Sequence, residues 1–383
     1  MNDRPRLAGN AQRHAEAARG HAVAAILCCA LLATGAPVPA QVPAGYPSSY
    51  AEVIAAARRE GKVVVHSTTD LSAAAPLVRA FEAAYPGITL DYAEMDSAVL
   101  NRRFMVETAS GASPADVLWS SAMDLQFKLV NDGFAQVYRS PEASALPEWA
   151  NWKNEAYGTT FEPVVFVYNE RQLRGDDIPQ THADFVRLLK NKSERFKAKV
   201  TTYDIRKSAV GFLLATQDSR ANPAFWPLVK QLGASGVRLE GNTAAMMEAI
   251  GTGAALLGYN VIGSYAMARA ARDPSIAVVL PKDYTLVLTR VMFIARGAPH
   301  PNAARLWVDF LLSQRGQALL AGKAGLPAVR GDVEGEYTAA AVTRLLGASV
   351  RPIGVGPGLL VFLDRAKQEE FRKQWSEATA GAR

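Results

Sequence analysis

The stretch Lys62-Val-Val-Val-His66-Ser-Thr-Thr-Asp70 joins an apolar strand to a turn of small hydroxyl residues. Helix-forming residues follow this turn, and a second strand is expected from Ile88 to Glu94. A helix N-terminus carries unpaired N–H groups and about half a positive charge, so small hydroxyl residues placed there favour an anion. The turn predicts a ligand site that includes Ser67, Thr68, Thr69 and Asp70, and it leaves open whether His66 takes part.

Helix and strand signals alternate along the rest of the chain, which favours α/β layers over a sandwich or a helical bundle. Further strands are expected at 116–120, 163–168, 199–203, 254–257, 276–280 and 284–295. About 340 residues follow the first 40, which is more than one hydrophobic core normally serves. The sequence therefore predicts two α/β lobes.

The first 40 residues have the pattern of a secretory signal peptide. Four arginines precede an apolar run from Ala22 to Leu32, and Val38-Pro-Ala40 offers small residues for cleavage near Ala40. An uncleaved membrane anchor and a lipoprotein modified at Cys28 are the alternatives. Because Cys28 and Cys29 both lie in this segment, we expect a periplasmic mature protein without disulfides or thiolate metal sites.

The charge balance is close to even. The chain has 42 Lys and Arg against 36 Asp and Glu. Removing the predicted signal peptide, the leader, lowers the excess of basic over acidic residues by two. The charges form no blocks, so the sequence gives no reason to expect a nucleic-acid partner.

Two further strand exits carry groups suited to an anion. Ser120 and Ser121 lie at the exit of the strand at 116–120, and a polar turn with an arginine and a hydroxyl follows the strand at 199–203. Such groups hold oxyanions through paired hydrogen bonds, although Arg206 equally fits a solvated surface charge. The candidate contacts from the second turn are Tyr203, Asp204, Arg206, Ser208, Ala209, Val210 and Gly211.

Three more residues complete the candidate ligand set. Tyr259 and Asn260 come after the short strand at 254–257, beside Gly258, which permits close backbone approach. Core packing is the alternative for Tyr259. Arg290 lies inside an apolar strand, where an unpaired charge is costly, so it needs a ligand anion or an internal carboxylate as its partner.

The sequence contains few of the residues and none of the common motifs that indicate an enzyme. Only His66, His182 and His300 follow the leader, and there is no His-Glu-x-x-His, Gly-x-Ser-x-Gly or P-loop motif. We therefore expect no catalytic residues, and an exported hydrolase with a carboxylate pair remains the alternative.

Five segments carry a resemblance to a known family: Val63-Val-Val-His66, Phe81-Glu-Ala-Ala-Tyr-Pro-Gly87, Ser113-Pro-Ala-Asp-Val117, Val165-Phe-Val-Tyr-Asn169 and Ala254-Ala-Leu-Leu-Gly-Tyr259. In this order they resemble the periplasmic solute-binding proteins of ABC importers, with the ferric-ion, thiamine and organophosphate binding group as the nearest branch. The resemblance covers nearly all of the mature chain. It implies the two-lobed type II periplasmic-binding-protein fold, with residues 45–162 and 285–332 in lobe 1, residues 163–284 and 333–383 in lobe 2, and a ligand cleft between them.

The departures from this family bear on the ligand. Ferric-ion members commonly present adjacent tyrosines after the strand that matches 254–257, whereas this chain has Tyr259 followed by Asn260. Ser120 and Ser121 stand where such members often place an acidic ligand. We therefore expect no metal or cofactor and favour a small organic anion, an organophosphate or phosphonate, captured by lobe closure. Ferric iron or thiamine is the alternative cargo.

The resemblance also implies the partners. We expect a monomer that presents its closed form to an ABC permease in the inner membrane. A module that reports ligand to a membrane histidine kinase is the alternative.

Overall fold

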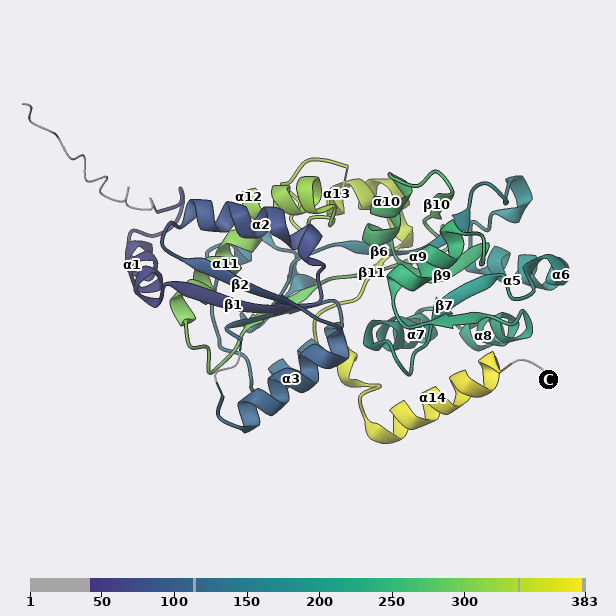
Figure 1. The fold of residues 1–383 in the computed structure, drawn as a ribbon, viewed down its shortest axis with the longest axis horizontal. Helices are drawn as coiled ribbons and strands as arrows, with labels where there is room; N and C mark the ends of the chain where they lie inside the picture. The colour runs from purple at the N-terminus through teal and green to yellow at the C-terminus, as the bar shows by residue number, and fades with distance from the viewer. Residues whose placement is uncertain (1–41, 113–114, 337, 381–383) are drawn as a thin grey trace, which may run out of the picture. The chain divides into compact units, whose positions relative to one another are not determined.

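The computed structural model describes residues 42–112, 115–336 and 338–380, which belong to one compact unit (Figure 1). The predicted signal peptide and both cysteines lie outside the described residues, as do Ser113 and Pro114 of one family segment. None of the helices in the described part is long and apolar enough to cross a membrane.

The first sheet has the strand order β2-β1-β3-β12-β5-β4. Its strands are β1 (Lys62–Ser67), β2 (Thr89–Glu94), β3 (Val117–Ser120), β4 (Asn151–Trp152), β5 (Ala156–Gly158) and β12 (Val291–Ile294). β1 pairs in parallel with β2 and β3, so the carboxyl ends of these three strands lie at one edge of the sheet. This edge is where the hydroxyl turns were predicted.

Helices cover both faces of the first sheet because its central strands are apolar on both sides. Val63 and Val65 of β1 pack with α1 (Tyr50–Glu60), α2 (Leu71–Ala84) and α11 (Pro301–Leu312). On the other face, α3 (Ser97–Ala109) and α4 (Met123–Asn131) pack against Leu118 and Phe293 of the sheet. Figure 1 shows α2 and α3 on opposite sides of β1.

The second sheet has the order β13-β11-β6-β9-β7-β8, and β10 also pairs with β6. Its strands are β6 (Glu162–Asn169), β7 (Val200–Tyr203), β8 (Arg238–Glu240), β9 (Leu257–Ile262), β10 (Ile276–Val279), β11 (Thr285–Leu288) and β13 (Val350–Pro352). Its helices are α5 (His182–Asn191), α6 (Ser193–Phe196), α7 (Ala209–Ala221), α8 (Phe225–Ala234), α9 (Thr243–Gly251) and α10 (Gly263–Ala270). The mixed α/β architecture with two sheets agrees with the sequence analysis.

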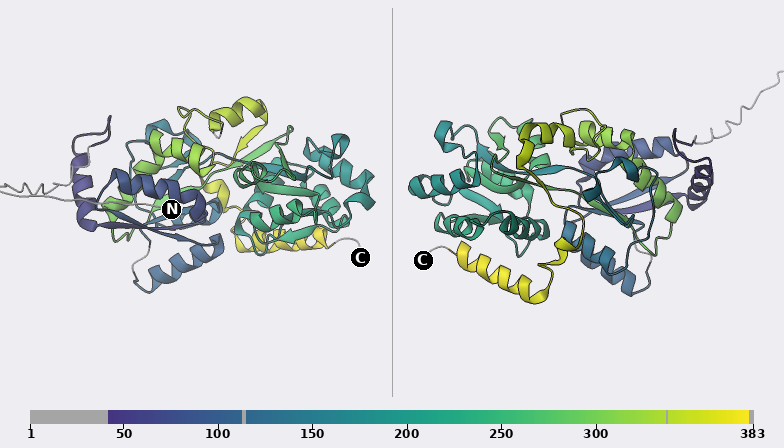
Figure 2. Two further views of the ribbon diagram at one scale, coloured as in Figure 1. Left: turned by 45° about the horizontal axis from the view of Figure 1, so that its top comes forward. Right: turned by 180° about the vertical axis from the view of Figure 1, so that it is seen from behind.

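The remaining α-helices follow α11 in the chain. They are α12 (Gln314–Leu319), α13 (Ala339–Leu346) and α14 (Arg365–Thr379). α14 packs Phe371 and Trp375 against Phe225 of α8, and both views of Figure 2 show it beside the second sheet's helices. α14 is therefore a packing helix near the C-terminal end of the described residues.

The strand predicted from 284 to 295 is in fact two strands in different sheets. β11 pairs with β6 in the second sheet, and β12 pairs with β3 and β5 in the first. Between them, the N–H of Arg290 donates to Thr160 Oγ1 at 2.9 Å, and the N–H of Thr160 donates to Thr289 Oγ1 at 3.2 Å. Side-chain hydroxyls thus replace ladder partners where the chain changes sheets, which apolar patterning does not reveal.

Asp309 of α11 is a buried carboxyl held by two tyrosines. Its Oδ2 accepts hydrogen bonds from Tyr50 Oη at 2.6 Å and Tyr138 Oη at 2.5 Å. Burial raises the pKa of Asp309 to about 6, because taking the carboxylate out of water outweighs the hydrogen bonds that stabilise its charged form. The folded state therefore binds a proton that the unfolded chain has released between about pH 4 and 6.

We expect this titration to appear in the stability of the protein. The contribution of Asp309 is fully present below about pH 4 and is lost as pH rises through 6, which amounts to roughly 2–3 kcal/mol. Asp309→Asn keeps an acceptor oxygen but cannot ionise, so its unfolding free energy should fall less with pH than that of the wild type. Urea denaturation from pH 4 to 7.5 measures the difference between the two proteins. Parallel pH profiles would show that Asp309 does not titrate in this range.

Candidate functional site

The exits of β1 and β3 meet at the carboxyl edge of the first sheet, and their hydroxyl side chains contact one another. Thr68 Oγ1 lies 3.3 Å from Ser120 Oγ and 3.4 Å from Ser121 Oγ, and it accepts the N–H of Ser121 at 3.0 Å. We call Thr68, Ser120 and Ser121 the hydroxyl cluster. Two segments more than 50 positions apart are therefore brought together as sheet topology predicts, because parallel neighbours end at the same edge.

The rest of the first turn is held by internal hydrogen bonds. Ser67 Oγ accepts the N–H of Thr69 at 3.0 Å, and the Thr69 carbonyl accepts the hydroxyl of Tyr92 at 2.6 Å. Ser67 and Thr69 are buried, whereas Asp70 is exposed at the start of α2. Asp70 does not cap α2 with its side chain, and its Oδ1 instead accepts the hydroxyl of Tyr265 at 3.1 Å.

Arg290 lies beside the hydroxyl cluster and forms a fully buried ion pair with Glu162. Its Nε and Nη2 donate to the two Glu162 oxygens at 2.8 and 3.1 Å. Its Nη1 donates to Thr69 Oγ1 at 2.9 Å and lies 3.5 Å from the Thr68 carbonyl. Burial lowers the pKa of Arg290, but the Glu162 charge, Tyr265 and the hydrogen bonds to both together outweigh that effect and hold the pKa above its ordinary value. Of the two partners considered for Arg290, the structure contains the internal carboxylate.

Glu162 is itself fully hydrogen-bonded. Besides Arg290, it accepts the hydroxyl of Thr160 at 2.8 Å and that of Ser264 in the first turn of α10. The ring of Tyr265, the next residue of α10, lies 5.2 Å from the Arg290 guanidinium. The starts of α2 and α10 thus meet through Asp70 and Tyr265 over this ion pair, which links elements of the two sheets.

The polar turn after β7 is built differently. Asp204 Oδ1 and Oδ2 accept hydrogen bonds from Arg206 Nε and Nη2, both at 2.9 Å. Hydrogen bonding to Arg206 lowers the pKa of Asp204, although burial of the carboxyl opposes it. The Arg206 side chain is 57% exposed, so its charge is shared between Asp204 and solvent. Ligand contact by this pair stays a prediction.

The start of α7 is capped within the chain. Ser208 Oγ accepts the N–H of Gly211 at 3.1 Å, and Ala209 and Val210 form the half-buried first turn. A Cβ at Gly211 would lie 2.4 Å from Tyr203 Cβ, so this turn requires glycine. Tyr203 is buried, and its hydroxyl lies 2.6 Å from Thr243 Oγ1.

The premise that placed Tyr259 and Asn260 at a strand exit is wrong. β9 runs from Leu257 to Ile262, so both residues lie inside the strand, and α10 begins only at Gly263. Gly258 does not end the strand, because it pairs with Val167 of β6, and the pairing resumes at Val261 after an irregularity between Val165 and Val167. The true exit of β9 is the Gly263–Tyr265 turn.

The polar groups of Tyr259 and Asn260 are occupied inside the protein. The Tyr259 hydroxyl donates to Asp218, as does the hydroxyl of Tyr284, and Asn260 Nδ2 donates to Asp218 Oδ2 at 3.1 Å. Burial first, and then the Asp218 charge, raise the pKa of Tyr259. This arrangement corresponds to the core-packing alternative for Tyr259, and ligand contact by either residue stays untested.

Sequence reasoning did not single out Glu162, Ser264 or Tyr265. A signal for Glu162 was present, because an acidic residue at the head of the apolar strand Pro163–Tyr168 needs a partner as much as Arg290 does. Ser264 and Tyr265 follow an apolar strand in the same way as the other exits, but the misplaced end of β9 concealed them. Within residues 42–112, 115–336 and 338–380, no group of three His, Cys, Asp or Glu side chains is arranged to hold a metal ion.

Comparison with known proteins identifies relatives of this chain. Residues 76–343 match the family described as bacterial extracellular solute-binding protein. The substrate-binding protein of an ABC transporter from Agrobacterium tumefaciens is 39% identical, covering 83% of this chain and 94% of its own, with a TM-score of 0.78. No curated protein matches the chain.

More distant structures share the fold. AfuA from Actinobacillus pleuropneumoniae, with fructose-6-phosphate bound, is 17% identical over 84% of this chain and 99% of its own, with a TM-score of 0.68. Iron-bound HitA from Pseudomonas aeruginosa is 15% identical over 83% of this chain and 99% of its own, with a TM-score of 0.63. These matches confirm the predicted type II periplasmic-binding-protein fold.

Proposed function

This chain belongs to the bacterial extracellular solute-binding proteins and is a substrate-binding protein of an ABC transporter, and from this premise we propose that its solute is a small organic anion, an organophosphate or phosphonate. The family is solute-binding rather than catalytic, and its extracellular character implies a periplasmic location for this chain. Such proteins pair with permeases in the inner membrane. A permease is accordingly the proposed partner of the closed form.

One observation carries the proposal, which is the convergence of three hydroxyls from two strand exits. Ser121 lies two residues before the start of α4 and Thr68 lies three residues before the start of α2, so the N-termini of both helices lie at the same edge. Hydroxyls and helix-start amides together suit a phosphate or phosphonate group. The fold accommodates a phosphate ester, since AfuA was solved with fructose-6-phosphate.

Arg290 and Tyr265 contribute in an indirect way. The ion pair with Glu162 and the hydrogen bond to Thr69 together use three of the five Arg290 donors, so Arg290 positions the Thr68–Thr69 turn and leaves direct contact mainly to hydroxyls and amides. Tyr265 reaches Asp70 from the other sheet's helix α10. We propose that this contact forms on closure and brings the exit of β9 over the solute.

A thermal-shift screen tests the solute class directly. Phosphoglycerate, a phosphonate, a sugar phosphate, thiamine and ferric citrate are added separately to the mature protein. We expect a phosphate ester or phosphonate to raise the melting temperature, because a ligand that binds only the folded state stabilises it. A shift with ferric citrate and a visible absorbance band, or a shift with thiamine alone, would contradict the proposal.

Removing the hydroxyl cluster should weaken binding. Thr68→Val and Ser121→Ala each delete a hydroxyl and keep the approximate shape, so each should reduce affinity for the solute found in the screen roughly tenfold. Ser193→Ala, at an exposed position on α6, serves as the matched control. Isothermal titration measures the affinities. Unchanged affinity in both cluster variants would place the solute elsewhere.

A further inference from the structure

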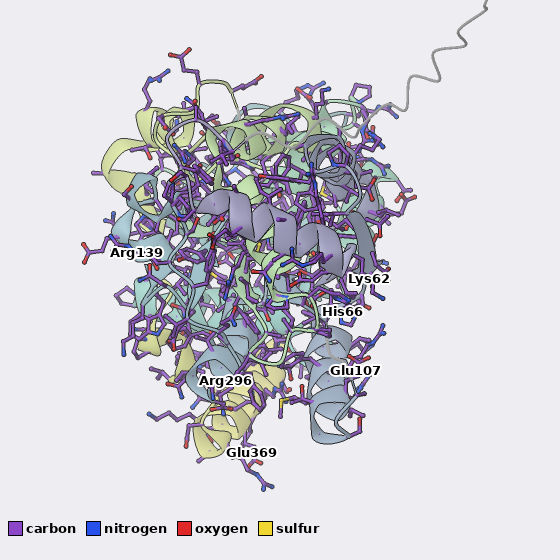
Figure 3. All side chains as sticks on the ribbon, turned by 90° about the vertical axis from the view of Figure 1, so that its left-hand side faces the viewer. Lys62, His66, Glu107, Arg139, Arg296 and Glu369 are labelled. Carbon is purple, nitrogen blue, oxygen red and sulfur yellow. The ribbon has the colours of Figure 1, made fainter. Side chains whose placement is uncertain are left out.

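A cavity that several charged and imidazole side chains line lies on the first sheet, away from the hydroxyl cluster. Its volume is about 330 Å³, and it lies between β1, α3 and the segment just before α11. Figure 3 shows Lys62, His66 and Glu107 along one side of the molecule. The lining residues are Lys62, Val64, His66, Arg103, Glu107, Ala115, Pro299 and His300, and none belongs to the hydroxyl cluster or the Arg290 ion pair.

The cavity brings together basic and imidazole side chains from three segments. Lys62 and His66 are alternate residues of β1, so they lie on the same face of the sheet as Val64. Arg103 and Glu107 lie one turn apart on α3 and form an ion pair at 2.6 Å through Nε and Oε1. Lys62 is exposed and the Arg103 side chain is 49% exposed, so both charges are accessible from solvent.

His66 has an unfilled hydrogen-bonding position. Its side chain lines the cavity, the residue is only 3% exposed, and its Nδ1 is buried without a partner. Burial, and then the nearby Arg103 charge, lower the pKa of His66, so the ring is neutral at neutral pH. A buried polar nitrogen without a partner costs free energy, which a bound group with complementary atoms would recover.

His300 is fixed on the opposite wall by Asp116. The carboxylate accepts the N–H of His300 at 2.7 Å and lies 2.9 Å from its Nδ1, and its Oδ2 also accepts the N–H of Val64 at 2.7 Å. With Nδ1 engaged, Nε2 is the ring nitrogen of His300 available for a further partner. Asp116 thus orients the ring without occupying the cavity.

We propose that this cavity is a second binding site, which takes a small oxyanion such as phosphate or a carboxylate. Lys62 and Arg103 supply the positive charge, and the imidazoles of His66 and His300 supply directed hydrogen bonds. Glu107 partly offsets these charges, which favours an anion of low charge. The site is independent of the transported solute.

Histidine NMR tests the site specifically. His66, His182 and His300 are the histidines that follow residue 40, and His182 is an internal control because it is buried against Asp283 and Tyr284. Inorganic phosphate and acetate are titrated into the mature protein at constant ionic strength, with chloride as the compensating salt. At least one of them should shift the ring signals of His66 and His300 saturably and raise the pKa of His66, while His182 stays unchanged.

Variants separate this site from general salt effects and from the solute site. Lys62→Met and Arg103→Met should each weaken the anion that shifts the signals about tenfold, and Glu107→Gln should tighten its binding several-fold. Lys367→Met, an exposed lysine on α14, and Thr68→Val should leave the titration unchanged. Histidine signals that do not move with either anion, or that move equally in the Lys62 and Lys367 variants, would overturn the proposal.

Discussion

Arg290→Met should lower the free energy of unfolding by about 3–5 kcal/mol. The substitution leaves Glu162 as a fully buried carboxylate with only the hydroxyls of Thr160 and Ser264 as partners. It also removes the donor to Thr69 Oγ1, which holds the turn that carries Thr68. Urea denaturation at pH 7 measures the loss.

A double variant shows whether the unpaired charge causes this loss. Glu162→Gln in the Arg290→Met background replaces the buried carboxylate with a neutral amide of similar shape. Much of the lost stability should return, because the dominant penalty is an uncompensated buried charge. An Arg290→Met protein within 1 kcal/mol of the wild type, or a double variant less stable than the single one, would contradict the assignment.

Asp218→Ala should have an effect of similar size, about 3–5 kcal/mol. The carboxylate is the acceptor for Tyr259, Tyr284 and Asn260, and each of these donors would be left without its partner in the interior. Asp218 is itself fully buried, so water does not readily replace it. Chemical denaturation, with near-ultraviolet circular dichroism to follow the tyrosines, is the appropriate measurement.

Two controls define this prediction. Asp218→Asn keeps an acceptor oxygen in the same place and should cost less than the alanine variant. Tyr284→Phe removes one of the three donors and should cost about 1 kcal/mol. If the alanine variant is no less stable than Tyr284→Phe, the three hydrogen bonds do not act as a network.

The sequence predicted the part of the site that depends on local signals. Thr68 directly follows one apolar strand and Ser120 ends another, and parallel pairing of β1 with β3 is enough to bring them together. The cap of α5 is likewise a local feature, since the Thr181 side chain accepts the N–H of Asp184, three residues later. These features depend on residues that are close in sequence or on a regular topology.

The parts that sequence reasoning missed depend on contacts between distant segments. Arg290 was known to need a partner, but Glu162 lies 128 positions away, and a single sequence gives no means of pairing them. The sequence analysis placed the end of β9 too early because glycine usually weakens a strand. Here pairing with β6 keeps Gly258 within the strand. An internal strand partner can override a local preference, and the positions of Tyr259 and Asn260 follow from that.

The position of β12 sets how late in synthesis the first sheet can be completed. The strands β1 to β5 all precede residue 159, but β12, at residues 291–294, is the strand that joins β3 to β5. Until those residues have been synthesised, β3 and β5 present open edges, so we expect the N-terminal half of this polypeptide to be prone to edge-to-edge aggregation during synthesis.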